Sequence, residues 1–75
     1  MSQVLIIDDE EKLRSLLARI IRLEGWSISE SSNLKNAHKI IEKEEPDVIL
    51  CDVKLPDGSG IDFVREVKQK NTDAE

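Results

Sequence analysis

One stretch decides the fold: Asp47-Val48-Ile49-Leu50-Cys51-Asp52, in which four consecutive apolar residues lead directly into a carboxylate. A short, uninterrupted apolar run is typical of a parallel strand that is buried on both faces. The turn-forming stretch Pro56-Asp57-Gly58-Ser59-Gly60 follows it, and we interpret Asp57 there as a turn residue. Open α/β sheets bind ligands at the carboxyl ends of their strands, so Asp52 is the first candidate functional residue.

A second apolar run, residues 4–7, is also followed by acids, at Asp8 and Asp9. We expect another buried parallel strand over residues 3–8. If the two strands are neighbours, their carboxyl ends lie about 5 Å apart, so that Asp8, Asp9 and Asp52 share one crevice. Carboxylates this close do not all stay ionised without a compensating charge. A ligand set made only of oxygens favours Mg²⁺, with Mn²⁺ as a second choice.

Helical and extended patterns alternate along the chain. Residues 26–31 alternate between apolar and polar side chains, which is typical of a strand at the edge of a sheet. We predict strands over residues 3–8, 26–31 and 47–52, and helices over residues 10–24, 33–44 and 59–70. This alternation predicts a parallel sheet that is covered by helices and joined by right-handed crossovers.

Local signals define the faces and the starts of the helices. Ser32 or Asn33 is expected to cap the second helix, and Ser59 the third. The apolar residues of the first helix recur at helical spacing and are expected to face the core: Leu13, Leu16, Leu17, Ile20 and Ile21.

Composition excludes several classes of protein. The chain has 75 residues, enough for one small domain, and its net charge of −5 disfavours binding to nucleic acid or to an anionic membrane. Its one cysteine, Cys51, forms no internal disulfide and is interpreted as an inert core residue, which suits a reducing cytoplasm. The first residues lack a secretory signal, and the longest apolar runs are far too short to span a membrane. We therefore expect a cytoplasmic location, with no direct contact to nucleic acid or membrane.

The two acidic motifs, residues 4–10 and residues 47–60, resemble those of the receiver domain of two-component response regulators. The resemblance runs along the whole chain in register, with both motifs at the family's spacing. It implies an α/β, flavodoxin-like three-layer sandwich, whose three strands stand in the order 2-1-3.

The resemblance also implies a role for individual residues. Asp52 is similar to the phosphoacceptor, and Asp8 and Asp9 to the acidic pair that holds Mg²⁺ together with Asp52. Lys54 matches the position whose backbone carbonyl is a further metal ligand. The implied function is phosphorelay signalling, in which a sensor histidine kinase supplies the phosphoryl group and the parent protein regulates transcription. Receivers of this kind are not enzymes, apart from weak self-phosphorylation and dephosphorylation in the full-length domain.

The sequence departs from the family in length, because a receiver has five βα units and residues 1–75 supply three. The family's hydroxyl residue and lysine, on its fourth and fifth strands, have no counterpart here, so we expect the full phosphorylation switch to be lost. The strand over residues 47–52 is also expected to expose one apolar edge, since the strand over residues 3–8 covers only the other. An exposed apolar edge is a template for pairing, which predicts a homo-oligomer formed through this edge.

Two other functions remain open at this stage. In the first, the chain is a half-domain that acts as a folding or assembly unit with a vestigial site. In the second, it is an aspartate-nucleophile phosphatase of the haloacid dehalogenase type, which also uses a strand-end aspartate and Mg²⁺. That class requires Asp-x-Asp after the first strand, whereas this chain has Asp8-Asp9-Glu10 and little length for a substrate cap. The cognate kinase, the effector domain and the regulated genes leave no signal in the sequence.

Overall fold

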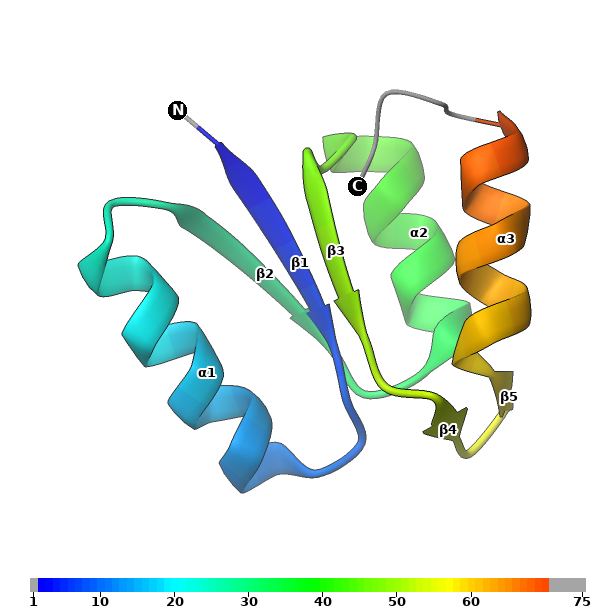
Figure 1. Ribbon diagram of the computed structural model, residues 1–75, viewed down its shortest axis with the longest axis horizontal. Coiled ribbons are helices and arrows are strands. Elements are labelled where there is room, and N and C mark those ends of the chain that lie inside the picture. The colour runs from blue at the N-terminus through cyan, green and yellow to red at the C-terminus, as the bar shows by residue number, and fades with distance from the viewer. Residues whose placement is uncertain (1, 71–75) are drawn as a thin grey trace.

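The computed structural model describes residues 2–70 (Figure 1). Its elements follow in the order β1 (Gln3–Ile7), α1 (Glu11–Leu23), β2 (Ser27–Ser31), α2 (Leu34–Glu44), β3 (Val48–Cys51), β4 (Lys54–Leu55), β5 (Gly58–Ser59) and α3 (Gly60–Lys70). The ends of the six long elements differ from the predicted ranges by at most one residue. The short β4–β5 hairpin is an addition, because the sequence analysis predicts only a turn there.

The main sheet is parallel and has the strand order β2-β1-β3, which confirms the predicted fold class. β1 is the central strand: Val4 is the register partner of Ile28 in β2 and of Val48 in β3. β2 lies at an edge, as its alternating pattern indicates. Asn33 caps α2 by accepting a hydrogen bond from the backbone N–H of Asn36 at 2.8 Å.

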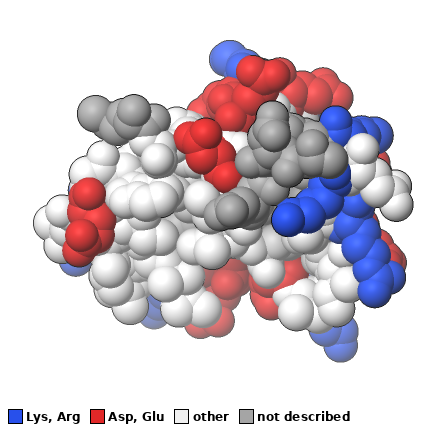
Figure 2. All heavy atoms as spheres, turned by 45° about the horizontal axis from the view of Figure 1, so that its top comes forward, with Lys and Arg blue, Asp and Glu red and all other residues white. Residues whose placement is uncertain are grey.

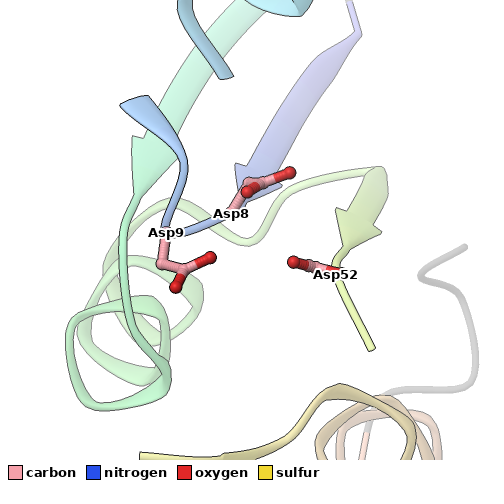
Figure 3. Close-up of side chains that lie close together, drawn as sticks. All are labelled: Asp8, Asp9 and Asp52. Carbon is pink, nitrogen blue, oxygen red and sulfur yellow. The ribbon is translucent and has the colours of Figure 1, made fainter. Parts of the chain in front are cut away.

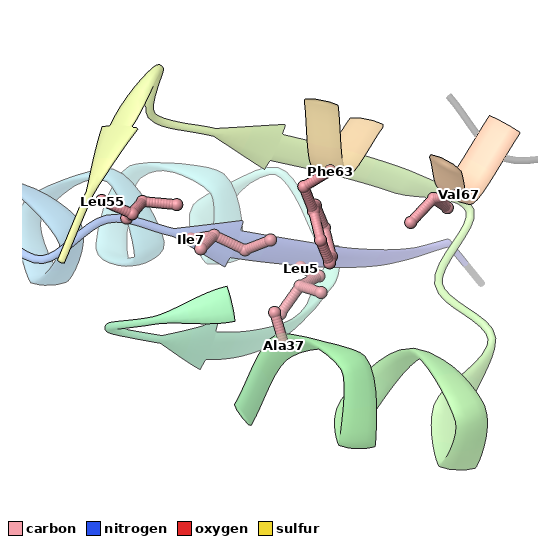
Figure 4. Close-up of a cluster of buried hydrophobic side chains, with 6 residues drawn as sticks. All are labelled: Leu5, Ile7, Ala37, Leu55, Phe63 and Val67. Atoms are coloured by element: carbon pink, nitrogen blue, oxygen red, sulfur yellow. The ribbon is translucent and has the colours of Figure 1, made fainter. Parts of the chain in front are cut away.

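Helices cover both faces of the sheet, α1 on one side and α2 with α3 on the other (Figure 1). Successive side chains of β1 point to opposite faces. Val4 and Ile6 pack with Ala18 of α1, whereas Leu5 and Ile7 enter the larger cluster under α2 and α3. Figure 4 shows the buried members of that larger cluster: Leu5, Ile7, Ala37, Leu55, Phe63 and Val67.

The prediction that β3 is buried on both faces is wrong. Leu50 is 42% exposed, and the other three residues of the strand are only half-buried. The cause is the position of α1, which lies over β1 and beside β2, where Arg14 contacts Glu30 at 3.1 Å. The side of β3 that carries Leu50 therefore stays uncovered. The strand that is buried on both faces is β1, since its residues Val4–Ile7 are at most 2% exposed.

The expected buried face of α1 also needs correction. Ala18 is buried and Leu17 and Ile21 are half-buried, as a core-facing stripe requires. A second apolar stripe, which we call the α1 stripe, is exposed instead: Leu13 at 41%, Leu16 at 51%, Ile20 at 51% and Leu23 at 81%. Its members recur with alternating steps of three and four residues, the spacing of a surface that packs against another helix.

Uncharged side chains also form a broad area on the face that Figure 2 presents, with Lys and Arg gathered at its right-hand side. Among residues 2–70, none of the helices combines the length and the apolar character that a membrane crossing requires.

Candidate functional site

Asp8 and Asp52 lie side by side at the carboxyl edge of the sheet. Ile7 and Cys51 are register partners at the ends of β1 and β3, so the next residue of each strand is an aspartate at the same edge. The backbone N–H of Asp52 donates to the carbonyl oxygen of Ile7 at 2.9 Å, which continues the ladder by one step. The sequence prediction that the two carboxylates share one crevice is thereby confirmed.

Asp9 completes the cluster (Figure 3). One carboxylate oxygen from each of Asp8, Asp9 and Asp52 lies within 4.8 Å of the other two. Asp8 and Asp52 are half-buried, and Asp9 is exposed. In the described part of the chain, no lysine or arginine nitrogen lies within 4.0 Å of these carboxylates. Three hard oxygen ligands without a cationic side chain fit a divalent ion such as Mg²⁺.

The backbone of Asp8 is fixed from two directions. Its N–H donates to the carbonyl oxygen of Ser31 at 3.0 Å, beyond the end of β2. Its carbonyl oxygen accepts from Nη1 of Arg14 at 2.6 Å, and its carboxylate Oδ1 accepts from the N–H of Glu10 at 2.9 Å. These bonds anchor Asp8 to β2 and to the start of α1, and they leave its second carboxylate oxygen available to a ligand.

Lys54 lies two residues beyond Asp52, in β4, where it pairs with Ser59. Its side chain is exposed, so a role for this residue at the site belongs to its backbone. The predicted role of its carbonyl oxygen as a metal ligand stays a prediction.

Cys51 lies beside the site, where its environment keeps the thiol neutral. Burial, together with the nearby carboxylates of Asp52 and Asp8, raises the pKa of Cys51 to about 11. Its Sγ donates to the carbonyl oxygen of Asp52 at 3.3 Å. A thiol with a raised pKa is a poor nucleophile and a poor metal ligand, which agrees with the interpretation of Cys51 as inert.

An open, mainly apolar hollow of about 310 Å³ adjoins the carboxylates. Ile6, Leu17 and Leu50 line it together with Asp8 and Asp52. It lies between α1 and β3, where α1 leaves the sheet uncovered. The site thus has an acidic rim and an apolar side.

The main role of Asp57 goes beyond the turn that its sequence context predicts. Its carboxylate oxygens accept from the backbone N–H groups of Leu34 at 2.8 Å and Lys35 at 3.0 Å, and these two bonds lower the pKa of Asp57 below its usual 3.8. Asp57 therefore caps α2 from the tip of the β4–β5 hairpin, in addition to Asn33. A cap that lies 23 residues from the helix start leaves no local sequence signal.

Comparison with known proteins identifies the class to which this fold and this site belong. Residues 4–75 match the family model of the response regulator receiver domain. The chain therefore belongs to this family and is a receiver domain of the two-component response regulators, which confirms the resemblance seen in the sequence.

Two curated relatives are transcriptional regulators. The phosphate regulon transcriptional regulatory protein PhoB of Pseudomonas aeruginosa is 38% identical over 66 residues, which are 88% of this chain and 29% of PhoB. The probable transcriptional regulatory protein TcrX of Mycobacterium tuberculosis is 35% identical over 68 residues, which are 91% of this chain and 29% of TcrX. The chain thus spans less than a third of the length of either relative.

Solved structures agree with this assignment. The response regulator TrrA of Thermotoga maritima, in complex with Mg²⁺-BeF, superposes with a TM-score of 0.93 and 31% identity, over 100% of this chain and 65% of TrrA. TrrA in complex with the histidine kinase ThkA gives a TM-score of 0.92 at the same identity and coverage. The flavodoxin-like architecture is therefore shared along the whole chain.

Proposed function

We propose that this chain accepts a phosphoryl group on Asp52 from a sensor histidine kinase, in the presence of Mg²⁺ and within a parent protein that regulates transcription. The supporting observation is the cluster of Asp8, Asp9 and Asp52 within 4.8 Å, at the carboxyl ends of two paired strands of a receiver domain. TrrA, a structural relative, has been solved both with Mg²⁺-BeF and with a histidine kinase, and its likeness to this chain supports the same partners here.

The proposed step is a phosphoryl transfer between two side chains. A carboxylate oxygen of Asp52 attacks the phosphorus of a phosphohistidine, and the new P–O bond forms as the P–N bond breaks. The imidazole nitrogen leaves with the electron pair of the broken bond and takes up a proton. The bond from the N–H of Asp52 to Ile7 fixes the attacking residue at the end of β3.

The carboxylates would hold the divalent ion that this transfer requires. We assign Asp8, Asp9, Asp52 and the backbone carbonyl of Lys54 as its ligands, with Mg²⁺ as the preferred ion and Mn²⁺ as a substitute. When bound, the ion neutralises charge on the carboxylates and on the incoming phosphoryl oxygens. We propose no enzymatic turnover of an external substrate.

Acetyl phosphate with MgCl₂ provides the direct test, because a small phosphodonor replaces the kinase. We expect the intact mass to increase by one phosphoryl group in the wild type and in Asp62→Asn, which removes an exposed carboxylate on α3. Asp52→Asn should show no increase. An increase that persists in Asp52→Asn would refute the assignment of the phosphoacceptor.

A second candidate function is assembly, and the free edge of β3 favours it. The strand order β2-β1-β3 leaves one edge of β3 without a partner within residues 2–70, next to the exposed side chain of Leu50. We propose that two copies associate through this edge. No mass increase in the acetyl phosphate test, together with a stable oligomer, would favour assembly over phosphoryl transfer.

Membership of the receiver family favours phosphoryl acceptance over the haloacid dehalogenase type of phosphatase. We further propose a cytoplasmic location. We also propose that this segment makes no direct contact with nucleic acid, which the net charge of −5 supports.

A further inference from the structure

The two ends of the segment from Val53 to Gly60, which connects Asp52 to α3, are hydrogen-bonded to each other. The N–H of Gly60 donates to the carbonyl oxygen of Val53 at 2.8 Å, which closes the base of the β4–β5 hairpin. A Cβ atom at Gly60 would clash with the carbonyl oxygen of Asp52, so the two backbones touch. The position of the hairpin therefore determines the position of the backbone that carries Asp52 and Lys54.

The tip of the same hairpin is fastened to the start of α2. The carboxylate of Asp57 bridges the N–H groups of Leu34 and Lys35, the first two residues of that helix. Apolar contacts reinforce this bond: Leu55 is 7% exposed in the core cluster against which Leu34 packs, and a Cβ at Gly58 would lie 2.9 Å from Cδ1 of Leu34. The tip thus has both a polar and an apolar attachment to α2.

The loop before α2 also contacts Asp8, which belongs to the carboxylate cluster on the β1 side. Ser31 accepts from the N–H of Asp8 through its carbonyl oxygen, and its Oγ donates to the carbonyl oxygen of Asn33 at 2.7 Å. Residues 31–35 therefore contact Asp8 on one side and Asp57 on the other. We call this loop, residues 31–35, the frame: it contacts Asp8 directly, and through Asp57 it contacts the hairpin that follows Asp52.

We propose that Asp57 is a positioning residue for the cation site, which fastens the Asp52–Lys54 backbone to the frame that also holds Asp8. This inference rests on the proposed function, because it assigns a role toward the ion that the three carboxylates bind. Mg²⁺ demands near-ideal octahedral geometry, so a loosened ligand backbone weakens its binding even when every ligand is present. Groups outside the ligand set commonly orient the ligands in this way.

The test is a Mg²⁺ titration of the full chain, by calorimetry and by amide NMR, in the wild type, Asp57→Ala and Asn33→Ala. Asn33→Ala is the matched control, because it removes only a side-chain cap at the same end of α2. The bond between hairpin and helix stays in place, and so does the backbone carbonyl of residue 33 that Ser31 contacts. We expect Asp57→Ala to weaken Mg²⁺ binding roughly tenfold, the lower end of the losses that follow removal of such orienting groups. Asn33→Ala is expected to bind Mg²⁺ like the wild type.

Asp57→Asn supplies a graded variant, because its amide oxygen still accepts one hydrogen bond. It should give an intermediate affinity, and its result decides the question if Asp57→Ala fails to give a dispersed spectrum. Equal losses in Asp57→Ala and Asn33→Ala would overturn the inference, since both would then report only the stability of α2. Wild-type affinity in Asp57→Ala would also overturn it and leave the proposed function intact. If the wild type itself bound no Mg²⁺, the proposed cation function would fail, and this inference with it.

Discussion

Asp8 and Asp52 follow register partners of two paired parallel strands, so the ladder of backbone hydrogen bonds itself brings their carboxylates together. The cluster therefore combines like charges at short range without a cationic side chain in the described part of the chain. These charges should lower the free energy of unfolding when no divalent ion is present and raise it when an ion is bound.

Asp52→Asn is expected to stabilise the protein when no divalent ion is present. Two unit charges within 4.8 Å of each other repel by at least about 1 kcal/mol at low salt, because a water-like dielectric gives the weakest repulsion at that distance. Urea unfolding in EDTA measures the gain, and Glu42→Gln on the exposed face of α2 is the charge-matched control. Added Mg²⁺ should stabilise the wild type more than Asp52→Asn. A variant that is less stable than the wild type in EDTA would contradict the repulsion.

Gly60→Ala is expected to lower the free energy of unfolding by about 2–3 kcal/mol, as overpacking against a backbone atom does. The new Cβ would meet the carbonyl oxygen of Asp52, which has no rotamer with which to move away. Gly25→Ala is the control: its Cβ meets nothing within 4 Å, and only the φ of +90° opposes it, at about 1 kcal/mol. An unchanged free energy of unfolding in Gly60→Ala would show that the close approach at Gly60 costs nothing.

Asp57 is expected to stabilise the fold in a pH-dependent way. The N–H groups of Leu34 and Lys35 lower its pKa in the folded state, so its contribution is fully present above the ordinary value of 3.8. The contribution is lost as the pH falls through the lower, folded-state pKa, where the carboxylate takes up a proton. The stability difference between the wild type and Asp57→Asn should therefore be constant near neutral pH and shrink in acid. A difference that grew in acid would contradict this sign.

Leu50→Lys is expected to prevent self-association, because a lysine on a free edge strand disfavours pairing with another strand. Sedimentation velocity at high protein concentration measures the effect. Gln69→Lys, which adds the same charge on the exposed side of α3, is expected to associate like the wild type. A monomeric wild type would contradict the proposed assembly outright.

The sequence predicted those features that local patterns specify. Apolar runs that end in acids identified β1 and β3, and a parallel sheet places the carboxyl ends of its strands at one edge. That the two strands are neighbours, so that Asp8 and Asp52 meet, was implied only by the resemblance to the receiver family. The exposure of Leu50 was not predictable, because it depends on which strands α1 covers. The apolar character of residues 48–51 is typical of a covered strand. Whether Leu50 is in fact covered depends on where α1 packs, which is a matter of tertiary structure.

The role of Asp57 as a cap of α2 could not be predicted from the sequence, for a different reason. The stretch from Pro56 to Gly60 indicates a turn, and a turn is present. That turn also forms a two-stranded hairpin, and its tip reaches the start of a helix far back along the chain. Propensity describes a residue among its neighbours, and it carries no information about a hydrogen bond to Leu34.

The pairing of β1 with β3 has a consequence for the order of folding. The connection between β1 and β2 contains α1 alone, whereas the connection that brings Val4 to Val48 also contains β2 and α2. Longer loops cost more entropy to close, so we expect β3 to dock after the parallel βαβ unit of β1, α1 and β2 has formed. An intermediate without docked β3 carries Asp8 and Asp9 but lacks the partner carboxylate. The full carboxylate cluster is thus acquired only when β3 docks, so a cation present during refolding is expected to slow the loss of docked β3 without accelerating the docking itself.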